Sequence, residues 1–400
     1  MVRVGILISA LSFVTPISGP AQVDPLVHDS IPILSRDEIG RIGGLDDRPE
    51  YALTTVESAV VLPNGEIALA DRGAHEIRFY DRSGVFLRKM GREGDGPGEF
   101  RAIVEIVPLG DDRILAWDIE RQRMTVFTVE GQLVNTGPLS ARGTESLFRS
   151  FIGVFPDGRI VMRAVGGMMG MRNERPGRQG RPVVYGIFAP TGELLDTTIS
   201  VEGPERQFFR DGNSSGLERL LLARELAAAV IPDGLVVGLT DSFHLRILDG
   251  VGEWKSYLRV DRPTRSATMD FVEAERARYM EAAEARAETP PDPRLPIPDA
   301  RRQLAQVEIR RLKDRGHHPT IPAFGGLLTA SDGALWVSDY PDFLGGVTTW
   351  YVWDQDKQMV GRITLPVEER VVAAGFGLLL TVTQDEFDLE SLVVSRLLLE

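Results

Sequence analysis

The sequence predicts an all-β fold, a six-bladed β-propeller with a helical insertion, over residues 36–400. Three observations predict it. One strand–turn–strand element recurs along the chain, most copies lie one blade of ~40–50 residues apart, and an N-terminal segment resembles the fourth strand of a repeat. Together they describe a ring of four-stranded sheets that is fastened by its own two ends.

The recurring element is an apolar run, a turn of Pro, Asn, Asp or Gly, and a second apolar run that often ends in Asp. Asn-Gly and Asp-Gly supply the positive φ of a tight turn, so each copy predicts a β-hairpin. A second hairpin follows most copies and completes four strands. The copies are Glu57–Asp71, Ala102–Asp118, Phe151–Ala164, Glu225–Asp241, Gly325–Asp339 and Arg370–Asp385.

The spacing of the turns fits one blade per repeat. Pro63 and Pro108 lie 45 residues apart, and Pro108 and Pro156 lie 48 apart. The gaps from Pro156 to Pro232 and from there to Ser331 are 76 and 99 residues, so we expect a blade plus an insertion in each. A seventh blade in the longer gap is the alternative, but helical periodicity in that gap disfavours it.

The ends of the chain predict how the ring closes. The segment Glu38–Asp47 resembles Phe86–Asp95, which forms the fourth strand of the first full repeat, and the last repeat has about three strands before Glu400. We therefore expect the N-terminal segment to supply the outer strand of the last blade, because this removes an open sheet edge.

The helical insertion spans residues 266–316, where Ala, Glu and Arg dominate and a proline-rich stretch separates two helical segments. It can be a lid over one mouth of the channel, a docking site for a partner, or decoration on the rim, and the sequence leaves these alternatives open. The expected elements are the cap Ser266 or Thr268, a helix over Met269–Glu288, the cap Asp299, a helix over Ala300–Arg315, and Gly316 at its C-terminal end.

Residues 1–21 predict a signal peptide. Arg3 precedes an apolar run that is too short to span a bilayer, and Gly19 and Ala21 are spaced for cleavage before Gln22. A buried strand or a misplaced start codon is the alternative. We expect a periplasmic or secreted protein without a membrane span after removal of the signal.

Composition narrows the range of partners. The formal net charge is −13 and there are no cysteines, which argues against nucleic-acid binding, disulfides and thiolate chemistry. The Gly- and Arg-rich segment 166–182 is expected to be a solvated loop, with an anion or glycan contact as the alternative. We expect a monomer.

Several residues resemble a known group of propellers. The segment Gly91–Phe100, "GREGDGPGEF", followed by an apolar strand, "PNG" and "ALAD", resembles the NHL-type repeat of six-bladed propellers. The end of the chain, Asp385–Leu399, is similar to the closing segment of bacterial exported propellers of unassigned role. The resemblance implies the fold and not an activity, because this fold hosts lyases, lactonases, receptors and scaffolds.

No catalytic motif fits its structural context. Gly212–Gly216 matches G-x-S-x-G, but a polar segment precedes it, so we expect a Gly/Ser loop and not a nucleophile elbow. Gly91–Phe100 lacks the Gly-Lys-Ser/Thr of a phosphate-binding loop and is expected between two blades.

The five histidines have no metal-ligand spacing, so we predict no metal site, while a calcium ion in the channel is left as an alternative. Recurring aspartates should cap loop amides or pair with arginines, and they are Asp71, Asp118, Asp241 and Asp339.

Charged residues recur about seven positions before several of the turns, near the start of the innermost strands. Buried charges are costly unless they are paired or hydrated, so a ring of them suggests a hydrated channel mouth. The alternative is that these charges only pair with one another. The predicted ligand-binding residues are Glu57, Arg101, Arg149, Glu225 and His318.

The favoured function is a non-catalytic exported propeller that binds a small polar or anionic ligand, a glycan or an envelope protein through this mouth. No cofactor is predicted. The alternative is a metal-dependent propeller hydrolase or lyase of the lactonase-like kind, which would need a carboxylate-rich channel. Arg101 and Arg149 pointing into the channel would count against that alternative, because fixed cations repel a divalent metal.

Overall fold

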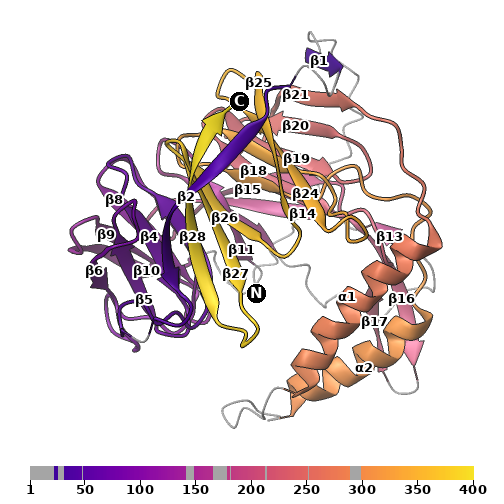
Figure 1. The fold of residues 1–400 in the computed structure, drawn as a ribbon, viewed down its shortest axis with the longest axis horizontal. Coiled ribbons are helices and arrows are strands. Elements are labelled where there is room, and N and C mark those ends of the chain that lie inside the picture. The colour runs from indigo at the N-terminus through magenta and orange to yellow at the C-terminus, as the bar shows by residue number, and fades with distance from the viewer. Residues whose placement is uncertain are drawn as a thin grey trace, which may run out of the picture.

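The computed structural model describes residues 22–25, 31–46, 48–140, 148–164, 178–180, 182–211, 214–250, 252–288 and 299–400. In this part of the chain six sheets follow one another around a ring, so the fold is the predicted six-bladed β-propeller (Figure 1). The predicted signal peptide, most of the Gly- and Arg-rich segment and the proline-rich stretch between the helices lie outside the described residues.

The first three blades are four-stranded antiparallel meanders in which the first strand is innermost. Blade 1 contains β3 (Val56–Val61), β4 (Ile67–Asp71), β5 (Glu76–Tyr80) and β6 (Phe86–Met90). Blade 2 contains β7 (Ile103–Pro108), β8 (Arg113–Asp118), β9 (Arg123–Thr128) and β10 (Leu133–Pro138). Blade 3 contains β11 (Phe148–Val154), β12 (Ile160–Ala164), β14 (Val183–Phe188) and β15 (Leu194–Val201).

The other three blades repeat this pattern with additions. Blade 4 contains β18 (Leu226–Ile231), β19 (Gly234–Leu239), β20 (His244–Leu248) and β21 (Trp254–Asp261), and β1 (Gln22–Pro25) pairs in parallel with β21. Blade 5 contains β22 (Leu327–Thr329), β23 (Leu335–Ser338), β24 (Val347–Trp353) and β25 (Met359–Pro366). Blade 6 contains β26 (Arg370–Gly375), β27 (Leu378–Gln384), β28 (Glu390–Leu399) and β2 (Leu34–Gly43).

The closing strand is the predicted one. Strand β2 pairs antiparallel with β28, so the N-terminal segment supplies the outer strand of the last blade (Figure 1). Ile42 on β2 is fully buried in a core shared by blades 1 and 6. Arg36 on β2 also donates two hydrogen bonds to Glu369, at 2.5 and 2.6 Å, and such a bidentate pair fixes orientation as well as distance.

An apolar core fills each space between neighbouring blades. The side chains of adjacent sheets alternate toward it, as in Trp117 and Met162 between blades 2 and 3, and Phe243 and Trp353 between blades 4 and 5. All four are nearly inaccessible to solvent. The ring is therefore held by successive interfaces and not by one central core, which leaves the axis open for a cavity.

The recurring aspartates play the two roles predicted for them. Asp118 accepts hydrogen bonds from the backbone N–H groups of Arg101, Ala102, Glu120 and Arg121, and Asp71 accepts equivalent bonds in blade 1. The other two aspartates form ion pairs instead, Asp241 with Arg224 and Asp339 with Arg262.

The two helices occupy the predicted ranges. They are α1 (Met269–Glu288) and α2 (Ala300–Asp314), and Thr268 Oγ1 accepts a hydrogen bond from the backbone N–H of Phe271 at 3.3 Å, as a cap does. Two details of the prediction were wrong. The Asp299 side chain makes no capping hydrogen bond, and the helix ends at Arg315 in an extended conformation, so Gly316 is not its cap.

The helices belong to a side module together with a small sheet of β13 (Arg178–Gly180), β16 (Glu205–Asp211) and β17 (Ser214–Glu218) (Figure 1). The serines of the G-x-S-x-G match lie at the start of β17, which pairs with β16, and Gly212 and Asn213 between the two strands lie outside the described residues. Phe271 and Val272 pack against Tyr340 and Phe343 of blade 5 and against Leu221, which lies between β17 and β18. Neither helix is long and apolar enough to cross a membrane.

Candidate functional site

A cavity of about 850 Å³ lies at the centre of the ring. All six innermost strands contribute to it, together with the turns that follow them, such as Pro108–Asp111 after β7 and Ser331–Gly333 after β22. The cavity therefore opens at the end of the blades where the first strand turns into the second. Its volume falls in the range of ~300–1,000 Å³ that is typical of small-molecule sites.

Small and aliphatic side chains form the wall of this cavity, among them Ala228, Val107 and Val372. Gly153 on β11 shows why small residues are needed, because a Cβ there would lie 2.8 Å from the Cβ of Val230 on β18. Close approach of the innermost strands therefore requires glycine at this position. Thr329, Ser331 and Gln355 add polar side chains to this otherwise largely apolar wall.

The charged residues that line the cavity within the described chain are all acids: Glu105, Asp111 and Asp332. Asp111 and Asp332 lie in the turns at the open end, and Asp332 accepts a hydrogen bond from the backbone N–H of Phe376 at 2.9 Å. Lysine, arginine and histidine are absent from the described lining. The electrostatics of the cavity therefore favour a cation and disfavour an anion.

Glu105 lies deeper, on the innermost strand of blade 2. Its Oε1 accepts a hydrogen bond of 2.5 Å from Ser58 Oγ on β3. Burial raises the pKa of Glu105 to about 7, although the hydrogen bonds from Ser58 and from the backbone of Ile106 work in the opposite direction. The nearby charge of Glu57 raises it further. A carboxyl group with this pKa can bind a proton or a cation near neutral pH.

A β-bulge places Glu105. Ile103 pairs with Asp118 and Glu105 pairs with Trp117, so Val104 is an extra residue in the strand. The same irregularity occurs in β3, β11 and β26 near the start of each strand. Because one inserted residue moves every later side chain to the other face, the position of Glu105 could not be read from simple alternation.

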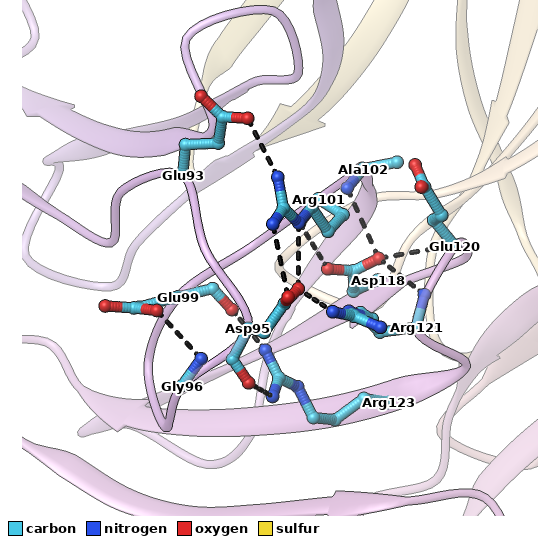
Figure 2. A network of polar contacts seen from close by, with 10 residues as sticks. All are labelled: Glu93, Asp95, Gly96, Glu99, Arg101, Ala102, Asp118, Glu120, Arg121 and Arg123. Atoms are coloured by element: carbon cyan, nitrogen blue, oxygen red, sulfur yellow. Dashed lines mark hydrogen bonds and ion pairs between the residues drawn. The ribbon is translucent and has the colours of Figure 1, made fainter. Parts of the chain in front are cut away.

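The structure places Arg101 in a network of its own, outside the cavity lining (Figure 2). Its guanidinium forms ion pairs with Asp95 at 2.8 Å and Glu93 at 2.9 Å, and its backbone N–H donates to Asp118. Arg121 also pairs with Asp95 (Figure 2). These contacts fix the segment Gly91–Phe100, which connects blades 1 and 2 as predicted.

The remaining predicted residues are also held by local partners. Glu57 pairs with Arg72 at 2.8 Å. Glu225 pairs with Arg206 at 2.7 Å and with Arg219 at 2.9 Å. The Nδ1 atom of His318 lies 2.9 Å from the Thr320 hydroxyl, and the His318 backbone N–H donates to Leu221. Arg149 lies on β11, and its side chain is outside the described part of the structure.

The predicted ring of charges mixes different strand positions. Arg101 and Thr54 occupy equivalent positions, because the backbone N–H of each donates to the aspartate that ends the second strand of its blade. Glu225 is equivalent to Thr55, one residue later, because the backbone carbonyl of each accepts a hydrogen bond from the residue that follows the second strand. Arg149 falls in a bulge, as Glu57 does. Counting back from the turn therefore fails, because the bulges add residues to some strands only. None of Glu57, Arg101, Glu225 and His318 lines the central cavity.

Within the described residues, no three His, Asp or Glu side chains come together in a geometry that could hold a metal ion. The three acids of the cavity are spread between its depth and its rim, so they do not form the carboxylate cluster that a lactonase-like channel metal would need.

This chain resembles known proteins only in the course of its backbone. No family model and no curated protein matches this chain. Among solved structures, a Bacteroides fragilis protein that is thought to be exported matches with a TM-score of 0.48 and 10% identity, over 92% of this chain and 96% of that one.

A member of the DUF4221 family from Bacteroides vulgatus matches with a TM-score of 0.47 and 10% identity, over 92% of this chain and 99% of the other. Virginiamycin B lyase from Staphylococcus aureus matches with a TM-score of 0.37 and 11% identity, over 91% and 95%. Likeness at this level carries no argument about activity, and the propeller fold rests on the sheets described above.

Proposed function

We propose that this chain is an exported propeller that binds a small, largely apolar ligand carrying a basic amine in its central cavity. The observation that carries the proposal is the lining: a largely apolar wall whose only charges, among the described residues, are the carboxyl groups of Glu105, Asp111 and Asp332. An ammonium group would satisfy Glu105, and the apolar body of the ligand would cover the wall.

This ligand class differs from the polar or anionic ligand that the sequence favoured. An anion would lie among three carboxyl groups with no described cation in the lining to balance it. The two arginines on which the anionic prediction depended do not supply that cation, because Arg101 is paired with Asp95 and Glu93 and the Arg149 side chain is outside the described part. A cationic amphiphile fits both features of the cavity.

The test is isothermal titration of the full chain with three probes of equal size, 4-phenylbutylamine, 4-phenylbutanol and 4-phenylbutyrate. We expect the amine to bind most tightly, and Glu105→Gln to weaken it by about tenfold or more while leaving the alcohol unchanged. Binding of the amine should strengthen as the pH rises through the Glu105 pKa of about 7, because the carboxylate form is the partner of the ammonium group.

Asp112→Asn is the matched control, since Asp112 is exposed beside Asp111 and does not line the cavity. It should leave the affinity for the amine unchanged. Equal affinities for the amine in the wild type and in Glu105→Gln would overturn the proposal, as would an amine that binds no better than the alcohol.

A further inference from the structure

A second cavity, of about 520 Å³, lies between blades 4 and 5. It is lined by Asp241–His244 between β19 and β20, by Arg259–Arg265 at the end of β21, and by Asp339 after β23. These connections are at the opposite end of the blades from the turns that border the central cavity. The two cavities are therefore separate, and their ligands can be considered independently.

Arg262 lines this second cavity and is held from several sides. Its Nη1 forms an ion pair with Asp339, and its guanidinium carbon lies 4.4 Å from the ring centre of Tyr351 and 5.0 Å from that of Phe243. Only 15% of the side chain is exposed. Two aromatic rings and a carboxylate therefore hold the guanidinium in one orientation.

The other edge of this guanidinium is formed by Nε and Nη2. Nε and Nη2 of Arg262 are buried, and neither makes a hydrogen bond within the described part of the protein. On a guanidinium these two N–H groups point in the same direction, and their spacing matches the two oxygens of a carboxylate. Leaving charged donors buried and unpaired is costly, so this edge lacks an acceptor.

The described charges around the cavity do not balance, and one positive charge is left over. Arg259 pairs with Asp261 at 2.8 Å, Asp241 pairs with Arg224 at 3.1 Å, and Asp339 is occupied by Arg262. Arg265 also lines the cavity, is exposed, and forms no ion pair with any described residue. Burial and the neighbouring Arg259 lower the pKa of His244, so this imidazole is neutral near pH 7.

We propose that this cavity is a second binding site, for a small organic carboxylate that displaces the groups now covering Nε and Nη2 of Arg262 and accepts their hydrogen bonds with its two oxygens. Arg265 would contribute a second positive charge at the rim. Phe243, Val260 and Ile321 line the same cavity and would contact a short apolar body. The inference does not depend on the function proposed for the central cavity, because the two lining sets share no residue.

The test is isothermal titration of the full chain with phenylacetate and with its neutral analogue phenylacetamide. We expect phenylacetate to bind and phenylacetamide to bind at least about tenfold more weakly, since the amide offers one acceptor and no charge. Arg262→Lys keeps the charge beside Asp339 but removes the fork, so it should weaken phenylacetate by about tenfold or more.

Arg265→Gln provides a second variant if Arg262→Lys destabilises the fold, because Arg265 is exposed. It should weaken phenylacetate by a few fold, whereas Arg301→Gln, which changes an exposed arginine on α2, should not. Glu105→Gln should also have no effect, which separates this site from the central one. The proposal is wrong if phenylacetate, acetate and succinate give no binding heat at millimolar concentration, or if phenylacetate binds equally to the wild type, Arg262→Lys and Arg265→Gln.

Discussion

Glu105 is a carboxyl group whose folded environment favours the protonated form, and this has a consequence for stability. Its pKa is about 7 in the folded protein and 4.5 in an ordinary setting, so the folded state binds the proton more tightly than the unfolded chain does. The stabilisation is complete below about pH 4.5 and is lost as the pH rises through about 7. Relative to Glu105→Gln, the wild type should lose on the order of 2 kcal/mol in free energy of unfolding over this range.

Urea unfolding of both proteins at several pH values measures this difference. The exposed Glu120 offers a control, because Glu120→Gln should give a curve parallel to that of the wild type. Parallel curves for Glu105→Gln would show that the channel carboxyl group is not perturbed. Sequence alone could not single out Glu105, since it appears as one polar residue within the apolar run Ile103–Pro108 and its depth depends on the ring around it.

At the scale of elements, the sequence predicted the strands, turns and helices better than it predicted the register of the strands. The hairpins and both helices could be predicted because turn residues, apolar runs and caps act within a few residues. The bulges could not, since whether Glu57 or Val104 is the extra residue depends on pairing with the second strand. For this reason the predicted ring of charges combined residues that occupy different positions along their strands.

The attachment of the helices to the ring yields a prediction at this same scale. The carboxylate of Glu275 on α1 is fully buried, accepts a hydrogen bond of 2.6 Å from the Tyr340 hydroxyl after β23, and pairs with Arg278 at 3.1 Å. Tyr340→Phe leaves this buried carboxylate with one partner fewer, which should cost about 1–3 kcal/mol. We expect faster hydrogen exchange in α1, measured by mass spectrometry, with little change in the blades.

Tyr279→Phe is the matched control, since the Tyr279 hydroxyl lies on the same helix and its hydrogen bond with Arg219 is exposed. It should leave exchange in α1 close to that of the wild type. If Tyr340→Phe behaves like Tyr279→Phe, the buried hydrogen bond does not hold the side module to blade 5. The apolar contacts of Phe271 and Val272 would then contribute more to the attachment than this hydrogen bond does.

For the whole molecule, we expect the free energy of unfolding to depend on the interface between blades 1 and 6, where the ring closes. A propeller whose blades pack only on their neighbours has one interface between its chain ends, and here that interface contains Ile42, Val56 and Leu380. Opening it exposes two sheet faces at once, since the faces of blades 1 and 6 pack on each other in this core. Ile42 is fully buried there, so Ile42→Ala should remove apolar contacts and leave a cavity.

We expect Ile42→Ala to lower the free energy of unfolding by about 2–5 kcal/mol, measured by urea unfolding monitored through tryptophan fluorescence. Ile33→Ala is the matched control, because Ile33 belongs to the same N-terminal segment and is 46% exposed, so it should cost about 0.5 kcal/mol or less. The five tryptophans lie in blades 2, 4 and 5, outside the interface between blades 1 and 6, so their fluorescence reports whether the rest of the ring unfolds with it. One cooperative transition at lower urea would mean that closure stabilises every blade, whereas an unchanged midpoint would show that the strand β2 pairs with β28 without holding the ring together.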